Sequence, residues 1–192
     1  MRAPTWWKND ERNRAHSDIS PAHLNHRVYV QMPLQRSLFR FHANSRVFPK
    51  RAEAYKNYFL NFTVDSKRLE PAVIFAAKDS KKSHRPRLTV EPFAKAAKLK
   101  IDTRFGNSQS TQLAADLRAN HQGKVILICW RHPYVPDLLR ALGAKPEDLL
   151  PRGKWPGAVY DWVILLSFDQ DGRLIPGSSR RINEHLMPDD FQ

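Results

Sequence analysis

Three apolar runs without alternation dominate the hydrophobic pattern of the chain. They are PAVIFAA at residues 71–77, VILICW at residues 125–130 and WVILL at residues 162–166. Such runs are typical of strands that are covered on both faces. The pattern therefore predicts three buried strands of one sheet, at Val73 to Ala77, Val125 to Cys129 and Trp162 to Leu166.

Segments with helical spacing alternate with these strands. Helices are predicted at 51–62, 88–100, 110–120 and 135–142, and a short strand at 101–105. Pro92 is expected near the first turn of the second helix, Ser108 or Ser110 is expected to cap the third, and Gly143 follows the fourth. Asp171-Gly172 predicts a turn after the third strand. This order predicts an α/β fold: a three-layer α/β/α sandwich with a mainly parallel central sheet.

The first quarter of the chain has a different composition. Of the formal net charge of +13, residues 1–51 carry +7, from ten Lys or Arg and three acids, and residues 52–192 carry the other +6. Only HRVYVQM and SLFRFH in this part resemble strands, and residues 1–25 have the composition of a disordered or loosely attached tail. We therefore expect a basic, irregular N-terminal segment at 1–46, unrelated to the α/β domain predicted at 47–192.

Composition also limits the class of protein. No apolar run approaches the roughly 20 residues of a membrane span, and the first sixteen residues contain no apolar block of the signal-peptide kind, so we expect a cytoplasmic protein that does not bind membranes. Cys129 is the single cysteine and lies within an apolar strand, where a buried thiol is expected. No two histidines have metal-ligand spacing on a predicted helix, so neither a metal nor another cofactor is expected.

Candidate chemistry lies just after two of the predicted strands. In a parallel sheet, ligands bind beyond the carboxyl ends of the strands, where loops meet helix N-termini. SKKSHRPRLT follows the first strand and provides Arg85, while WRHP follows the second and provides Arg131 and His132. An arginine matches the charge and fork geometry of a phosphate, and a histidine beside it can donate to another oxygen. The pattern thus predicts a phosphate site.

These segments resemble the histidine phosphatase superfamily, also called phosphoglycerate-mutase-like. AAKDSKKSHRPRLTVEPFAKA, with Arg85 four residues before Thr89, is similar to the family's Ser-Pro-x-x-Arg-Ala-x-x-Thr-Ala motif at the start of a helix. VILICWRHPYVPDLLRALG is similar to its later strand, histidine and helix ending in Leu-Gly, with Arg131 in place of the family's glycine. KWPGAVYDWVILLSFDQDGRLI resembles its last strand and hairpin. The resemblance covers about residues 47 to 185.

The sequence departs from the family where the nucleophile is expected. Family members begin with a strand that ends in Arg-His-Gly or Arg-His-Ala, whose histidine becomes phosphorylated, and neither motif occurs in this chain. HRVYVQMP has the strand without the Arg-His pair. LFRFHANS separates Arg40 from His42 by one residue. If the family mechanism operates, His42 is the nucleophile, Arg40 and Arg85 hold the phosphate, and His132 is the second histidine.

The resemblance implies a protein that binds phosphate or a phosphorylated small molecule and is catalytically impaired. Two alternatives stay open: an active phosphomonoesterase that uses His42, and a basic module that binds nucleic acid through residues 1–51. The sequence assigns no proton donor, although Asp102 and Glu91 are candidates.

Overall fold

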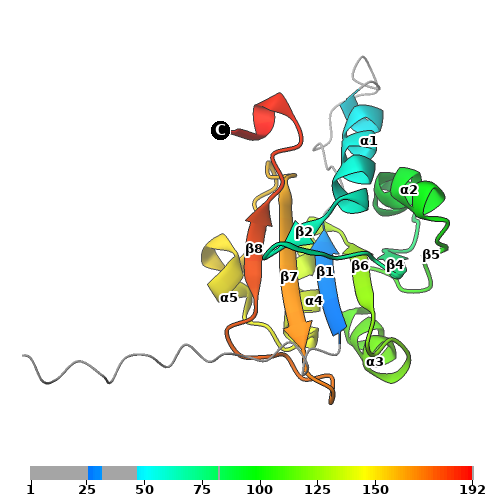
Figure 1. Ribbon diagram of the computed structural model, residues 1–192. Helices are drawn as coiled ribbons and strands as arrows, with labels where there is room; N and C mark the ends of the chain where they lie inside the picture. The colour runs from blue at the N-terminus through cyan, green and yellow to red at the C-terminus, as the bar shows by residue number, and fades with distance from the viewer. Residues whose placement is uncertain (1–25, 32–46, 82, 192) are drawn as a thin grey trace, which may run out of the picture.

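A six-stranded sheet forms the centre of the protein. The computed structural model describes residues 26–31, 47–81 and 83–191 (Figure 1). The sheet has the strand order β5-β4-β6-β1-β7-β8, and a two-stranded ribbon, β2-β3, lies apart from it. The strands are β1 (His26–Gln31), β2 (Thr63–Val64), β3 (Lys67–Arg68), β4 (Val73–Ala76), β5 (Ile101–Asp102), β6 (Val125–Cys129), β7 (Trp162–Phe168) and β8 (Arg180–Asn183).

The helices connect the strands in the predicted alternation. The α-helices are α1 (Val47–Leu60), α2 (Arg85–Ala97), α3 (Ser110–Asn120), α4 (Val135–Ala141) and α5 (Pro146–Leu149), and the short 3-10 helices are η2 (His132–Tyr134), η3 (Pro151–Gly153) and η4 (Pro188–Phe191). Within the described residues, no helix is both long enough and apolar enough to cross a membrane.

The sheet is mainly parallel, as predicted. Strand β4 pairs in parallel with β5 and β6, and β6 pairs in parallel with β1. Strand β7 is antiparallel to both of its neighbours, β1 and β8. Strand β8 therefore points the same way as β1, and β7 alone runs against the other five strands, as its arrow shows in Figure 1.

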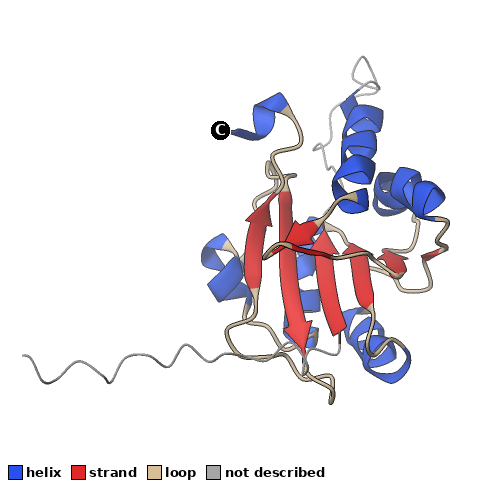
Figure 2. Ribbon diagram, in the orientation of Figure 1, coloured by secondary structure: helices blue, strands red, loops and turns tan. Residues whose placement is uncertain are grey.

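Helices cover both faces of the sheet, which confirms the three-layer sandwich (Figure 2). On one face, Tyr55 and Phe59 of α1 and Phe93 of α2 pack in one core cluster with alternate residues of the central strands, such as Leu127. On the other face, residues of α3, α4 and α5 pack with the intervening positions, such as Ile126. Because successive strand side chains point to opposite faces, each apolar run contributes to both clusters.

The three predicted buried strands are confirmed, and the third extends further than predicted, to Phe168. The predicted turn is also present. Asp169 donates its backbone N–H to the carbonyl of Arg173 at 2.9 Å, and Gly172 adopts a left-handed φ of 72°. Gly143, with a φ of 90°, follows the C-cap of α4, as predicted.

The predicted start of α2 and the predicted cap of α3 were wrong, whereas α3 begins at Ser110 as predicted. Helix α2 begins at Arg85 with Pro86 in its first turn, so Pro92 lies inside the helix. Pro86 suits the first turn because its missing N–H would have no partner there, and this places the start three residues earlier. The N-cap of α3 is Gln109, without a side-chain capping bond; its Oε1 accepts the N–H of Gly106 at 2.7 Å, so neither Ser108 nor Ser110 is the cap.

Strand β1 comes from the basic segment that the sequence analysis set apart. It is hydrogen-bonded between β6 and β7, with Gln31 opposite Cys129 on one side and opposite Val163 on the other. The described sheet thus includes residues 26–31 at its centre. The proposed tail at 1–25 and the strand-like SLFRFH lie outside the described residues.

Candidate functional site

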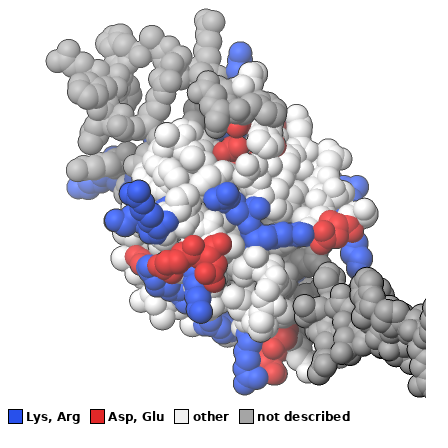
Figure 3. All heavy atoms as spheres, turned by 90° about the vertical axis from the view of Figure 1, so that its left-hand side faces the viewer, with Lys and Arg blue, Asp and Glu red and all other residues white. Residues whose placement is uncertain are grey.

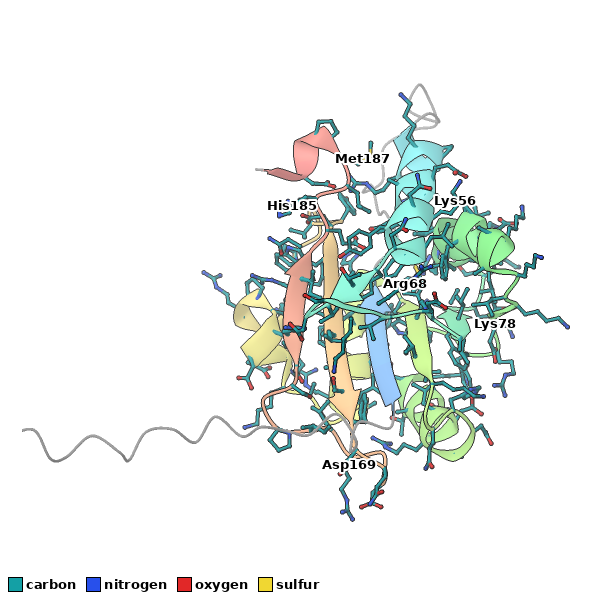
Figure 4. All side chains as sticks on the ribbon, in the orientation of Figure 1. Lys56, Arg68, Lys78, Asp169, His185 and Met187 are labelled. Carbon is teal, nitrogen blue, oxygen red and sulfur yellow. The ribbon has the colours of Figure 1, made fainter. Side chains whose placement is uncertain are left out.

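The carboxyl ends of β1, β4 and β6 lie level with one another at one edge of the sheet. Cys129, the last residue of β6, is opposite Ala76 of β4 and opposite Gln31 of β1. Beyond this level, Ala77 donates its N–H to the carbonyl of Cys129 at 3.0 Å. The segments that follow β4 and β6 therefore leave the sheet side by side, as parallel topology predicts. Lys78, labelled in Figure 4, lies where β4 ends.

Arg85 is the first residue of α2 and is half-buried. Its backbone N–H lies 3.4 Å from Ser83 Oγ. Ser80 and Ser83 exchange two backbone hydrogen bonds, of 3.0 and 3.1 Å, which close the loop just before the helix. The first turn of α2 contains no acid, so the positive end of the helix dipole is not offset from within the helix. This local structure places Arg85 at the N-terminus of the helix that follows β4.

Asp79 connects this loop to the helix. Its Oδ2 accepts a hydrogen bond from Arg87 Nε at 2.9 Å and lies 3.0 Å from His84 Nδ1. Burial raises the pKa of Asp79, but the hydrogen bonds and charges of Arg87 and His84 outweigh burial and bring the pKa below its ordinary value. Asp79 is therefore ionised at neutral pH.

His132 and Arg131 follow β6 after the fully buried Trp130. Both side chains are half-buried, and the described residues offer neither of them a hydrogen bond or an ion pair. A β-carbon at position 157 would lie 3.9 Å from His132 Nε2, so the loop before β7 passes close to the ring at Gly157. Burial, and then the charge of Arg131, lower the pKa of His132. The ring is neutral at pH 7 and sits in cationic surroundings.

The structure thus brings together the elements that carry Arg85, Arg131 and His132, because α2 and η2 follow neighbouring strands that end at the same level. That these side chains bind one common anion stays a prediction. Arg40 and His42, the other predicted site residues, lie outside the described residues. Cys129 is fully buried, and burial, followed by the charge of Glu184, raises its pKa, so it is no nucleophile.

A largely buried ionic cluster at the same edge was not predicted from the sequence. Asp161 precedes β7 and Glu184 follows β8; both are buried, and the N–H of Glu184 donates to the carbonyl of Asp161 at 2.6 Å. His185 Nδ1 lies 3.9 Å from Asp161 Oδ2, and Arg51 of α1 pairs with Asp190. Burial, and then the charge of Asp190, raise the pKa of Asp161.

No local signal in the sequence could have revealed this cluster, because its members come from α1, β7 and the C-terminal segment. In Figure 4, His185 and Met187 lie at the edge nearest α1, whereas Asp169 lies at the opposite edge of the sheet. No group of three His, Cys, Asp or Glu residues in the described part of the chain could hold a metal ion.

A surface hollow of about 410 Å³ lies elsewhere, between β8 and the α5–η3 segment. It is lined by acids and bases, among them Glu147, Asp148 and Arg181, and Figure 3 shows both charges on this face. The Arg181 guanidinium lies 4.1 Å from the centre of the Trp162 ring. Because β8 is at the far side of β7 from β4 and β6, this hollow is separate from the candidate phosphate site.

Comparisons with known proteins give structural matches alone. Neither the models of protein families nor the curated proteins contain a match. Similar solved structures include a protein assigned as the phosphohistidine phosphatase SixA from Agrobacterium tumefaciens, with 15% identity, a TM-score of 0.47, and coverage of 78% of this chain and 95% of that chain. Phosphoglycerate mutase from Plasmodium falciparum has 12% identity, a TM-score of 0.49, and coverage of 79% and 88%.

A second protein assigned as SixA, from Nakamurella multipartitia, has 12% identity, a TM-score of 0.45, and coverage of 79% and 94%.

Proposed function

We propose that this protein binds phosphate esters at the carboxyl edge of the sheet, between the start of α2 and the segment 131–132. The observation that carries the proposal is the level ending of β4 and β6, with Ala76 opposite Cys129. Arg85 follows one strand at a helix N-terminus, and Arg131 and His132 follow the other. Two guanidinium groups and a helix N-terminus at one edge favour a dianionic ligand.

Each group has a distinct part in binding. The guanidinium of Arg85 offers paired N–H donors that match two phosphate oxygens, and the helix dipole adds to its charge. His132 is neutral without a ligand because burial and Arg131 lower its pKa. A bound anion counteracts both effects, so the ring takes up a proton and donates a hydrogen bond to a third oxygen. The ligand class is a phosphorylated small molecule or phosphate itself.

The proposal includes impaired catalysis. By the superfamily resemblance, the nucleophilic histidine directly follows the first central strand. Strand β1 has this central place and ends at Gln31, and the sequence continues with Met32 and Pro33. His42 stands eleven positions after Gln31 in the sequence (42 − 31). A nucleophile misplaced by about 1 Å can already lose on the order of a hundredfold in rate, so we expect very slow hydrolysis.

An activity assay tests this reading against an active phosphomonoesterase. We expect slow hydrolysis of an aryl phosphate by the purified protein, and the same rate after His42→Ala. His23→Ala, which removes another histidine of the N-terminal segment, is the matched control. If hydrolysis is brisk, is abolished by His42→Ala and is preserved in His23→Ala, the protein is an active phosphatase with His42 as its nucleophile, and the proposal of impaired catalysis is wrong.

A further inference from the structure

Asp79 is a negative charge in the loop before α2, and the proposed function places a bound anion at the start of this helix. An isolated carboxylate near a phosphate weakens binding by charge repulsion. The negative charge of the Asp79 carboxylate is compensated here, because Arg87 Nε donates to Oδ2 at 2.9 Å and His84 Nδ1 lies 3.0 Å from the same oxygen. Arg87 also lies 3.6 Å from Glu91 on the next turn of α2. Asp79 is thus part of an ion-pair network that begins in the loop and continues along the helix.

The contacts of Asp79 lie on both sides of Arg85 in the chain. His84 is the N-cap residue of α2 and makes no side-chain capping bond, while Arg87 belongs to the first turn. A single oxygen that contacts both residues fixes the loop against the first turn, and Arg85 lies between them. The Ser80–Ser83 backbone pair and the contact of Ser83 Oγ with the Arg85 N–H restrain the same turn. Asp79 therefore links the loop to the residues on either side of Arg85.

The second carboxylate oxygen supports the same conclusion. Asp79 Oδ1 is buried and accepts no hydrogen bond from any described residue. A buried oxygen without a partner costs free energy, so Asp79 is not optimised for stability alone. A carboxylate that lies near an anion site at this cost is explained if its contacts orient the residues that bind the anion.

We propose that Asp79 is a positioning residue for phosphate binding: through His84 and Arg87 it holds the start of α2 so that the Arg85 guanidinium faces the anion. This inference rests on the proposed function. It extends that function because Asp79 itself does not touch the ligand.

A double-mutant cycle tests the inference with inorganic phosphate as the probe. Phosphate affinity is measured by calorimetry at low salt for the full chain and for Asp79→Asn, Arg85→Ala and the double variant. We expect Asp79→Asn to weaken binding by about tenfold, as for the loss of one charged hydrogen bond. In the double variant, Asp79→Asn should cause no further loss, because Arg85 is no longer there to be positioned.

Two further variants separate positioning from general stability. Asp65→Asn removes a carboxylate that accepts two bonds from Arg180, at 3.1 and 2.7 Å, on the β2–β3 ribbon, and should leave phosphate affinity unchanged. Arg87→Gln keeps the Asp79 carboxylate but removes its guanidinium partner. It should also weaken binding, and it provides the test if Asp79→Asn does not fold, as judged by circular dichroism.

The outcomes are distinct. If Asp79→Asn binds phosphate as well as or better than the unmodified chain, or if its effect adds fully to that of Arg85→Ala, Asp79 does not act through Arg85 and the inference is wrong, although the proposed function stands. If the unmodified chain binds no phosphate, the proposed function is wrong and this inference is wrong with it.

Discussion

Replacement of Arg51 by methionine removes one partner of a buried ion pair and retains most of the side-chain volume. Arg51 Nη1 and Nη2 donate to the two oxygens of Asp190 at 2.6 and 2.7 Å, and the two side chains are 3% and 6% exposed. Asp190 Oδ2 also accepts the N–H of Met187 at 2.8 Å. The pair therefore joins α1 to the C-terminal segment beyond β8.

The expected loss of stability follows from burial. Two unit charges about 4 Å apart attract by about 4 kcal/mol at an effective dielectric constant of about 20. Removal of one partner of a buried pair typically costs about 3–5 kcal/mol, because the remaining charge is left without compensation. Since domains of this size are stable by about 5–15 kcal/mol, Arg51→Met should remove a large share of the free energy of unfolding.

Urea denaturation at pH 7 measures this loss, and an exposed pair gives the control. Arg173 Nη1 lies 3.3 Å from Asp171, and these side chains are 79% and 59% exposed. Arg173→Met should change the free energy of unfolding by less than about 0.5 kcal/mol. A loss below about 1 kcal/mol for Arg51→Met would contradict the buried pair and the docking of the C-terminal segment on α1.

The pH dependence of the Arg51→Met loss provides an independent check. Burial and Asp190 already hold the pKa of Asp161 above its ordinary 3.8, and Arg51 is one of the groups that oppose this. Without Arg51 the pKa rises further, so the folded state binds more protons than the unfolded state between pH 3.8 and the raised pKa. Stability is then gained as the pH falls through that range, and the loss caused by Arg51→Met should become smaller towards acid pH.

Two further predictions concern single side chains, those of His132 and Thr89. His132 in the unfolded chain takes up a proton as the pH falls below 6.5, whereas burial and Arg131 keep the ring in the folded chain neutral to lower pH. Between pH 7 and 5, the unmodified chain should therefore lose more stability than His132→Gln, as measured by urea denaturation. An equal loss in both proteins would contradict the lowered pKa. Thr89 is fully buried and its Oγ1 has no partner among the described residues. Thr89→Val should leave the free energy of unfolding unchanged or raise it by up to about 1 kcal/mol, which thermal denaturation measures as an equal or higher melting temperature. A clearly lower melting temperature would show that the hydroxyl is hydrogen-bonded.

The strands were predictable because a strand that is buried on both faces has an unbroken run of apolar residues. Runs such as VILIC have no polar position, since Ile126 and Leu127 face different helical layers and both layers exclude water. The reversed direction of β7 was not predictable from its residues, because an apolar run reads the same in either direction. The position of β1 at the centre of the sheet depends on pairing with β6 and β7 and is likewise not local.

The position of the candidate site in the fold was predictable as far as the strands before it were predictable. Arg85 and His132 follow strands that were recognised, so their place at the carboxyl edge could be expected before the structure was known. The start of α2 was misjudged because Pro86 and Pro92 both fit a first turn, and the choice depends on the loop before the helix. The contacts of Asp79 and of Asp161 depend on tertiary packing and left no local pattern.

The central claim, phosphate binding at the edge where β4 and β6 end, is tested most directly by titration of the full chain with inorganic phosphate. The His132 ring proton signals are followed by NMR in the unmodified chain, in Arg85→Ala and in the Arg173→Ala control. We expect saturable binding that raises the pKa of His132, is weakened by about tenfold or more in Arg85→Ala, and is unchanged in Arg173→Ala. Absence of any saturable shift at His132, or equal affinity in Arg85→Ala and the unmodified chain, would contradict it.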